Sequence, residues 1–182
     1  MADTTGATTG RSRMVTGLFR DRESAERAYG SVSSRGYGKD DVNLLMSDDT
    51  RKKYFSDDTT HKDTELGNKA LEGAGLGGAI GGTAGALLAA IAAIGTTIAL
   101  PGLGLLVAGP LAAALAGAGA GGLTGGLIGA LIGAGIPEER AKLYDEGVRN
   151  GGIVMGVTPR TDEDAAYFEN EWKNYHGEHV YR

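Results

Sequence analysis

The sequence has 182 residues, a formal net charge of −5 and no cysteine. The lack of cysteine excludes disulfides, thiolate metal sites and a cysteine nucleophile. The acidic balance argues against sequence-independent binding to nucleic acid, which requires clustered Lys and Arg. Residues 1–12 are small and polar and have no apolar core of a signal peptide, so we expect a disordered tail.

The next part of the chain, residues 13–66, is expected to form a strand, a helix, a second strand and a linker. Residues 14–19 (MVTGLF) are a short apolar run with β-branched members, which predicts a strand. Asp21 is a candidate N-cap for the helix that follows, and Gly36 and Gly38 end it. The apolar residues of this helix recur at helical spacing: Ala25, Ala28, Tyr29 and Val32. Residues 42–46 (VNLLM) predict the second strand, and residues 47–66 a charged linker with one helical turn near 51–55.

The C-terminal part, residues 137–182, predicts a helix, a strand, a helix and a short edge strand. Pro137 fits the first position of a helix that ends at residues 150–152 (NGG), before a strand over residues 153–157. Asp162 or Thr161 caps the last helix, and residues 179–181 are the edge strand. The inner faces of the two helices are Ala141, Tyr144 and Val148, then Ala165, Phe168, Trp172 and Tyr175.

The predicted order of elements is β-α-β in residues 13–66 and α-β-α with a final strand in residues 137–182. Two strand-helix-strand units in one antiparallel sheet predict an α+β fold, a ferredoxin-like α/β sandwich whose halves fold against each other. An apolar block separates the halves. The expected organisation is a tail over residues 1–12, a first half with linker over 13–66, an apolar helical hairpin over 67–136, and a second half over 137–182.

The apolar block runs from Gly73 to Pro137, 65 residues without a charged side chain. We interpret it as a helical hairpin with arms over residues 73–100 and 111–136. At about 1.5 Å per residue each arm is roughly 40 Å long, enough to cross a hydrocarbon core of about 30 Å. The expected tip of the hairpin is rich in proline and glycine: Pro101, Gly102, Gly104, Gly109 and Pro110. Because the tip has no polar side chain, it is expected either in an apolar layer or in a dry centre where several tips meet.

Glycines recur every fourth residue in both arms and are predicted to carry helix packing and oligomerisation. They are Gly73, Gly77, Gly81 and Gly85 in the first arm, and Gly117, Gly121, Gly125, Gly129 and Gly133 in the second. The two arms contain 17 glycines in all, 8 in residues 73–100 and 9 in residues 111–136. Each glycine costs about 1 kcal/mol against alanine in a helix interior, so the arms together carry a penalty on the order of 15 kcal/mol. Such helices need lipid or a dense protein assembly around them. A water-soluble core hairpin and low-complexity disorder are the alternatives.

Three stretches resemble the bacterial general stress protein family, also called heat-induced stress protein YflT-like. They are VTGLFRDRESAERAYGSVSSRGYGKDDVNLL (residues 15–45), PGLGLLVAGPLAAALAG (101–117) and GIPEERAKLYDEGVRNGGIVMGV (135–157). The third, which joins a glycine-rich arm to GIPEERA, is the most specific. The resemblance implies a small stress-associated bacterial protein with a ferredoxin-like domain, and it implies no catalytic residues.

Other candidate sites are weaker. His176 and His179 are three residues apart with Gly177 between them, which does not fit a zinc pair on one helix face. The glycines of residues 75–82 lack the Lys-Ser/Thr ending of a phosphate loop. The pairs of aspartates at 48–49 and 57–58 lack the spacing of a calcium loop and are expected to be solvated. We therefore expect no catalytic residue, no metal and no cofactor.

The function expected from these patterns is that of a non-enzymatic stress-response protein. Its glycine-zipper hairpin would insert in the inner membrane and drive self-association, with a cytoplasmic head. A soluble homo-oligomer with hairpins buried tip-inward is the first alternative, and a ligand- or partner-sensing module, by fold analogy alone, is the second. The expected partners are other copies and membrane lipid, with neither nucleic acid nor an evident small-molecule substrate.

Overall fold

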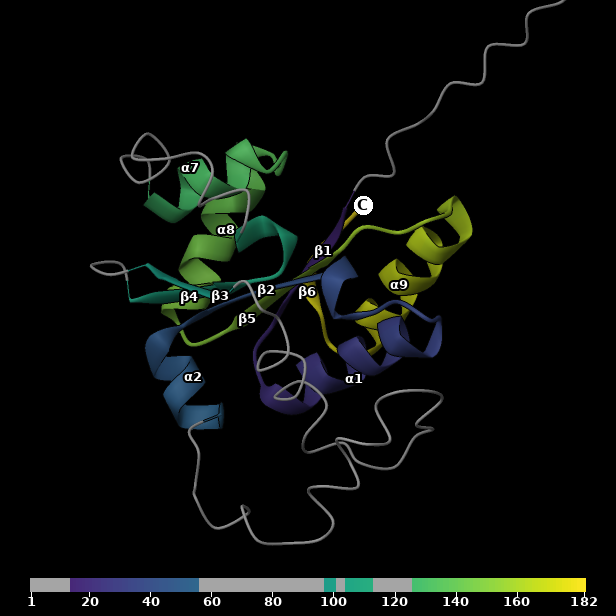
Figure 1. Ribbon diagram of the computed structural model, residues 1–182, viewed down its shortest axis with the longest axis horizontal. Coiled ribbons are helices and arrows are strands. Elements are labelled where there is room, and N and C mark those ends of the chain that lie inside the picture. Colours follow the sequence, from purple (N-terminus) through teal and green to yellow (C-terminus); the bar gives the residue numbers. More distant parts are fainter. Residues whose placement is uncertain (1–13, 56–96, 101–103, 113–125) are drawn as a thin grey trace, which may run out of the picture.

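The computed structural model describes residues 14–55, 97–100, 104–112 and 126–182 (Figure 1). The expected tail over residues 1–12 and most of the expected hairpin lie outside these residues. Within them the chain forms an α+β fold, in which a six-stranded sheet of antiparallel pairs lies between helices. The strand order is β3-β4-β2-β5-β1-β6.

The first half of the chain supplies two strands and two helices. Their bounds are Val15–Phe19 (β1), Arg22–Ser34 (α1), Val42–Ser47 (β2) and Asp48–Phe55 (α2), with a 3-10 turn at Lys39–Asp41. Asp21 caps α1 as predicted, since its carboxylate accepts the backbone N–H of Ser24 at 2.8 Å. The expected linker begins as α2, a helix of eight residues rather than a single turn.

The second half supplies the remaining central elements. They are Glu138–Arg149 (α8), Ile153–Val157 (β5), Asp162–Asn174 (α9) and Glu178–Tyr181 (β6). Thr161 rather than Asp162 caps α9, with its hydroxyl on the N–H of Asp164 at 3.1 Å. Pro137 stands one residue before the first helical residue of α8, in an extended conformation. The predicted helices and strands of this half are confirmed to within about two residues.

The two halves share one sheet because their strands alternate in space. β5 lies between β1 and β2, and β1 lies between β5 and β6. Neither half therefore has a sheet of its own, and the expectation that the halves fold against each other is confirmed. Helices α1 and α9 cover one face of the sheet, and α8 covers the other (Figure 1).

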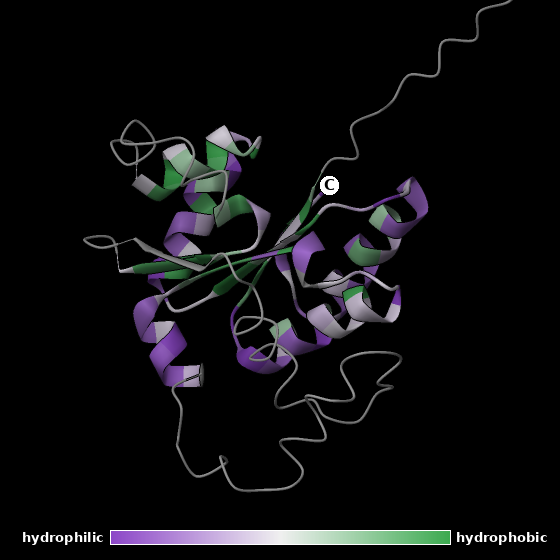
Figure 2. Cartoon of the chain, viewed as in Figure 1, coloured by the Kyte–Doolittle hydropathy of each residue, from purple (hydrophilic) through white to green (hydrophobic). Residues whose placement is uncertain are grey.

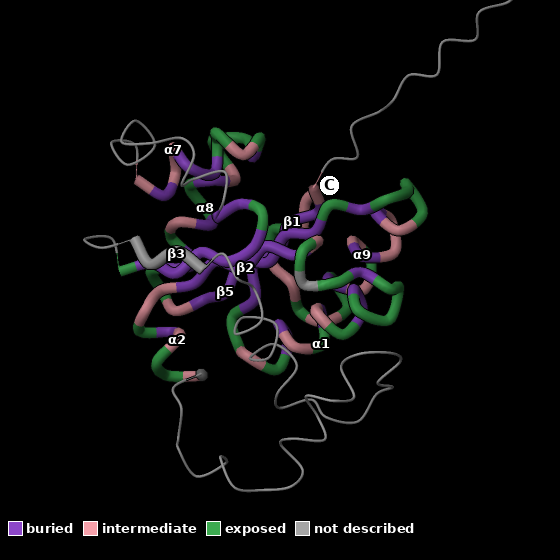
Figure 3. The backbone as a smooth tube through the Cα atoms, in the orientation of Figure 1, coloured by how far each residue is buried: buried purple, intermediate pink, exposed green. Residues whose placement is uncertain are grey.

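Both faces of the strands β1, β2 and β5 are buried, so these strands read as nearly continuous apolar runs rather than as alternating ones. Side chains still alternate between two apolar clusters: Phe19, Leu44 and Met46 point to α1 and α9, whereas Leu18 and Leu45 point to α8. Figure 3 shows this buried layer through the centre of the molecule. Figure 2 shows that the apolar strands are flanked by helices that carry hydrophilic residues, except for α7, which is mostly hydrophobic.

Two segments of the expected hairpin are strands instead. Thr97–Leu100 is β3 and Leu105–Ala108 is β4; β4 pairs with β2, and β3 with β4. The expectation of helix at the end of the first arm and of a separate tip is wrong at these residues. The physical reason is that β2 would otherwise end the sheet with an unpaired row of backbone groups, which β4 covers.

A further helix from the expected second arm is Gly126–Gly133 (α7), beside α8 (Figure 1). The connection between α7 and α8 is a compact turn: the N–H of Ile136 reaches the carbonyl of Leu131 at 3.0 Å, and Gly135 adopts a φ of +89°. This is the Schellman arrangement, in which glycine takes the left-handed position after a helix. The switch from apolar to charged sequence at Pro137 therefore coincides with the junction of two packed helices.

Candidate functional site

The candidate site is the described part of the apolar insertion: β3, β4, the helical residues 110–112 and α7. Helix α7 turns Leu127, Ala130 and Leu131 inward, where they are buried. Leu127 and Leu131 face the side chains of α8 and the sheet in one apolar cluster, whose other members include Leu45, Val107, Ala141, Tyr144 and Val148. The inner side of α7 is thus an ordinary core-facing helix surface, and its packing comes from leucine and alanine rather than glycine.

The glycines of α7 lie on its other side. A Cβ built on Gly129 or Gly133 would meet no heavy atom of the described chain within 4 Å. Ile132, between them in sequence, is 42% exposed. The side-chain positions of these two predicted packing residues therefore point away from the head. The other predicted packing glycines lie outside the described residues: Gly73, Gly77, Gly81, Gly85, Gly117, Gly121 and Gly125.

The residues expected at the hairpin tip are divided between a turn and the sheet core. Gly104 is exposed with a φ of +60°, just before β4, and Pro110 is an exposed helical residue. Gly109 has a φ of +95°, and a Cβ there would lie 2.2 Å from the carbonyl oxygen of Val42. Pro101 and Gly102 lie outside the described residues. Because Leu105–Ala108 is buried throughout, the described part of the expected tip belongs to the head itself.

Asn43 joins the insertion to the head. Its side chain leaves β2 on the α8 side, and its Oδ1 accepts the backbone N–H of Leu111 at 2.6 Å. Asn43 is 6% exposed, and its amide nitrogen donates to the sulfur of Met14 at 3.3 Å. An N–H in the first turn of a helix has no partner within the helix, so a buried carboxamide there replaces water. We did not predict this role, although a polar residue inside the apolar run VNLLM was a visible signal.

A hollow between the sheet and the α7–α8 layer lies beside Asn43. Its walls are mostly apolar and include Met14, Leu111, Leu131, Ile136 and Gly156, and it has room for no more than about one water molecule. Met14 fills the space above Gly156, since a Cβ on that glycine would lie 3.0 Å from the methionine sulfur. The hollow is a small gap in the packing that a methionine side chain closes.

The opposite end of the sheet is held by Tyr144. Its hydroxyl lies 2.8 Å from both Oγ1 of Thr16 and the carbonyl oxygen of His179. Burial raises the pKa of Tyr144, whereas the hydrogen bond with Thr16 lowers it. The guanidinium of Arg140 also donates to the His179 carbonyl at 2.9 Å. Two donors thus hold His179, whose φ is +51°, at an irregularity in the β1–β6 pairing.

The two histidines of the C-terminus have structural positions. His176 has a φ of +61° and is the left-handed residue after α9, where the N–H of Gly177 reaches the carbonyl of Trp172 at 2.7 Å. In the described residues no group of three or more His, Asp or Glu side chains could hold a metal ion. Asp48 forms ion pairs with Arg51 and Lys52 on α2.

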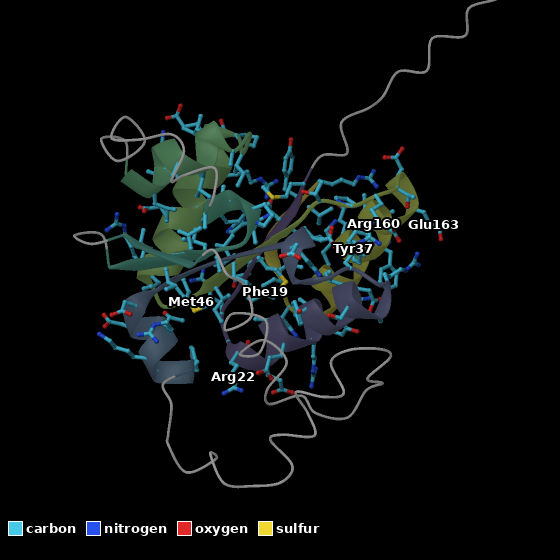
Figure 4. The ribbon with its side chains drawn as sticks, viewed as in Figure 1. Phe19, Arg22, Tyr37, Met46, Arg160 and Glu163 are labelled. Carbon is cyan, nitrogen blue, oxygen red and sulfur yellow. The ribbon has the colours of Figure 1, made fainter. Side chains whose placement is uncertain are left out.

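A polar joint connects the ends of α1 and α9 (Figure 4). Tyr37 donates from its hydroxyl to Asp164 at 2.6 Å and accepts the backbone N–H of Arg160 at 2.6 Å. Arg35 pairs with Asp164 at 2.9 Å, and the Arg160 guanidinium lies 4.2 Å from the centre of the Tyr37 ring. The hydrogen bond from Tyr37 is the main cause that lowers the pKa of Asp164, with help from Thr161 and Arg35. The polar groups of the joint bind one another, so the role of the joint is to hold the ends of α1 and α9 together.

Comparison with known proteins does not assign the chain to a family. No protein-family model, curated protein or solved structure matches the chain. Among the helices that the structure describes, none is long and apolar enough to cross a membrane. The candidate site is defined by its geometry. It is an apolar insertion that contacts the head at Asn43 and Gly109, and the glycines of its helix α7 face outward.

Proposed function

We propose that this chain is a non-enzymatic scaffold whose copies associate through the apolar insertion, with the α+β head as the carrier. The observation that carries the proposal is the orientation of α7. Leucine and alanine face the head, whereas Gly129, Gly133 and the exposed Ile132 face away from it. A helix that needed only the head for its packing would gain from alanine at the outer positions.

Bare glycine backbone on a helix is stabilised by close approach of a second helix. Without side chains between them, two backbones gain dispersion and Cα–H···O contacts. In sequence, the four-residue glycine spacing runs from Gly117 to Gly133, and α7 carries its last two positions, Gly129 and Gly133. Gly126, the first residue of α7, has a φ of +60°, so the helix of α7 does not continue unbroken before it. The partner we propose for this face is the same face of a second copy.

The head is proposed to be a ferredoxin-like sandwich. The strand order β2-β5-β1-β6, with α1 and α9 on one face, supports this assignment. In this proposal β3, β4 and α7 are additions made by the insertion. The stress-associated role that the sequence resemblance implies belongs to the same proposal, and it rests on the three resembling stretches alone.

Membrane insertion is the second candidate, favoured by the 65 uncharged residues from Gly73 to Pro137. The described parts of that stretch constrain how it would occur. Ala112 and Leu127 are buried in the same apolar cluster of the head, and β3 and β4 lie in its sheet. Segments that start and finish at the head favour entry into lipid from one side, by a cytoplasmic head bound at the inner membrane.

The test compares leucine substitutions at glycines with open surroundings. Gly129→Leu and Gly133→Leu fill the outer face of α7, and Gly30→Leu is the matched control. Gly30 is an exposed helical glycine of α1, with no heavy atom of the described chain within 4 Å of a built Cβ. The full chain is expressed without detergent, cleared of membranes by ultracentrifugation and sized by light scattering.

We expect the wild type and Gly30→Leu to assemble, and Gly129→Leu and Gly133→Leu to lose at least about tenfold in association affinity. A monomeric wild type at about 100 μM, or unchanged assembly of both α7 variants, contradicts the proposal. Flotation with phosphatidylcholine vesicles tests the second candidate. A monodisperse lipid-free particle that does not float would remove membrane insertion and leave self-association in place.

A further inference from the structure

The insertion supplies one end of the sheet, and the direction of its backbone hydrogen bonds follows from two contacts. The N–H of Asp48 donates to the carbonyl of Gly104 at 2.7 Å, one position beyond the paired residues Ser47 and Leu105. Antiparallel pairs alternate between hydrogen-bonded and non-hydrogen-bonded. Leu106 and Ala108 therefore direct their N–H and C=O groups to β2, and Leu105 and Val107 direct theirs to β3.

The pairing of β2 with β5, on its other side, shows independently which residues of β2 are hydrogen-bonded to which neighbouring strand. The N–H of Thr158 donates to the carbonyl of Asp41 at 3.4 Å, one position beyond the pair Val42 and Val157. Asn43 and Leu45 therefore bond to β5, which leaves Leu44 and Met46 for β4. Since Ile98 pairs with Val107 and Leu100 with Leu105, these two residues of β3 bond to β4. The backbone groups of Thr97 and Ala99 therefore point away from β4, to a side where no strand of the described residues pairs with β3.

The two ends of the sheet differ in charge. The end strand β6 carries Glu178 in an ion pair with Arg20 at 2.8 Å, and its pairing with β1 is irregular. Charges and irregularities of this kind protect an edge against pairing with another chain. In contrast, β3 (TIAL), β4 (LLVA) and α7 contain no charged residue. The neighbouring helix α2 has its Asp48 paired with Lys52 at 2.6 Å.

We propose that β3 pairs antiparallel with β3 of a second copy, so that the two sheets become one. In a chain with a net charge of −5, an uncharged edge is where two copies approach with least repulsion. A two-fold axis beside Ile98 pairs Thr97 with Ala99 of the second copy, and Ala99 with Thr97 of the second copy. This register satisfies the outward N–H and C=O groups of both residues in both chains. The inference deepens the proposed self-association and rests on it.

Ala99→Pro removes an outward N–H but none of the β3–β4 hydrogen bonds, because the N–H of Ala99 points away from β4. Proline is tolerated at such a position of an edge strand. Ala99→Ser, which keeps the N–H, is the matched control. We expect Ala99→Pro to raise the dimer Kd of the full chain at least about tenfold in sedimentation, and Ala99→Ser to leave it within about twofold. An Ala99→Pro variant that folds, by circular dichroism, and dimerises like the wild type overturns the inference.

A cysteine cross-link provides a test that does not depend on the proline variant. The chain has no cysteine, so Ile98→Cys carries a single thiol. In the proposed register residue 98 lies opposite residue 98 of the second copy, in a non-hydrogen-bonded pair with Cα atoms about 4.5 Å apart, within disulfide range. We expect a disulfide-linked dimer under mild oxidation, and none from Glu178→Cys on β6.

The outcomes separate this inference from the proposed function. An assembling wild type with no cross-link at residue 98 overturns β3 pairing and leaves self-association standing. A monomeric wild type with no cross-link overturns both. Cross-linked dimers that persist when Gly129→Leu is added to Ile98→Cys show that the β3 edge and the α7 face are separate contacts, as we expect.

Discussion

The side-chain oxygen of Asn43 accepts the backbone N–H of Leu111 at 2.6 Å, inside the layer between the sheet and α7. This hydrogen bond joins β2, a central strand of the head, to the first helical residues after β4. It adds a buried side-chain contact to the backbone pairing of β2 with β4, and together they tie the charge-free insertion to the head. The insertion is therefore part of the folded unit at this point, and the contact can be removed by a single substitution.

Asn43→Ala should lower the free energy of unfolding by about 1–3 kcal/mol, because it leaves a buried N–H without a partner. Urea denaturation measures the loss, and hydrogen exchange should show a faster amide at Leu111. Asn174→Ala, at the exposed end of α9, is the control and should stay within about 0.5 kcal/mol of the wild type. An unchanged stability of Asn43→Ala would show that Leu111 finds another acceptor.

Gly109→Ala should destabilise the protein by more than about 4 kcal/mol or prevent its folding. A methyl group there would lie 2.2 Å from the backbone oxygen of Val42, at a φ of +95°, where both the clash and the conformation are unfavourable. Gly104→Ala is the matched control, since Gly104 also has a positive φ but no neighbour within 4 Å. It should cost about 1 kcal/mol from conformation alone. Equal thermal unfolding of the two variants would contradict the proposed anchoring at Gly109.

Tyr37→Phe should lower the free energy of unfolding by about 1–3 kcal/mol at neutral pH, because the hydroxyl serves both Asp164 and the N–H of Arg160. It should also change the pH dependence of stability. The pKa of Asp164 is lowered in the folded state, chiefly by Tyr37, so its contribution is present above about pH 4 and is lost as pH falls further. The variant should lose part of this acid dependence.

At alkaline pH the sign is reversed. Burial, followed by the hydrogen bond to Asp164, raises the pKa of Tyr37, so its contribution is present below about pH 10 and is lost as pH rises beyond that. Asp164→Asn is the control for the pair, and the double variant should be less destabilised than the sum of the single ones. The free energy of unfolding is measured by urea denaturation from about pH 3 to about pH 11. If the loss in the double variant equals the sum of the two single losses at every pH, the two groups are not coupled.

His176→Gly should stabilise the protein by about 1 kcal/mol and raise its Tm. His176 takes the left-handed position after α9, with a φ of +61°, where glycine has no steric penalty. His176→Val should lower the Tm, because a β-branched residue is strained there. A lower Tm for the glycine variant would assign the histidine side chain a stabilising contact of its own.

The sequence was sufficient for the parts of this protein that depend on near neighbours. The cap at Asp21, the apolar faces of α1, α8 and α9, and the apolar runs of β1, β2 and β5 follow from spacing within a few residues. The charge-free block also stands out in the sequence, and so do its regularly spaced glycines. These features arise from local hydrogen bonding and from the helical and strand periods, which a linear reading contains.

Only the tertiary structure showed which parts of the head the described residues of the charge-free block contact. β3 and β4 are four residues each, too short for a strand period to stand out among alanine and glycine, and they form because β2 needs a neighbour. Periodicity marked Gly129 and Gly133 as one helix face but not which way that face points, since this depends on where Leu127 and Leu131 find the sheet. Asn43 and Gly109 acquired their roles in the same way, from contacts between residues far apart in the chain.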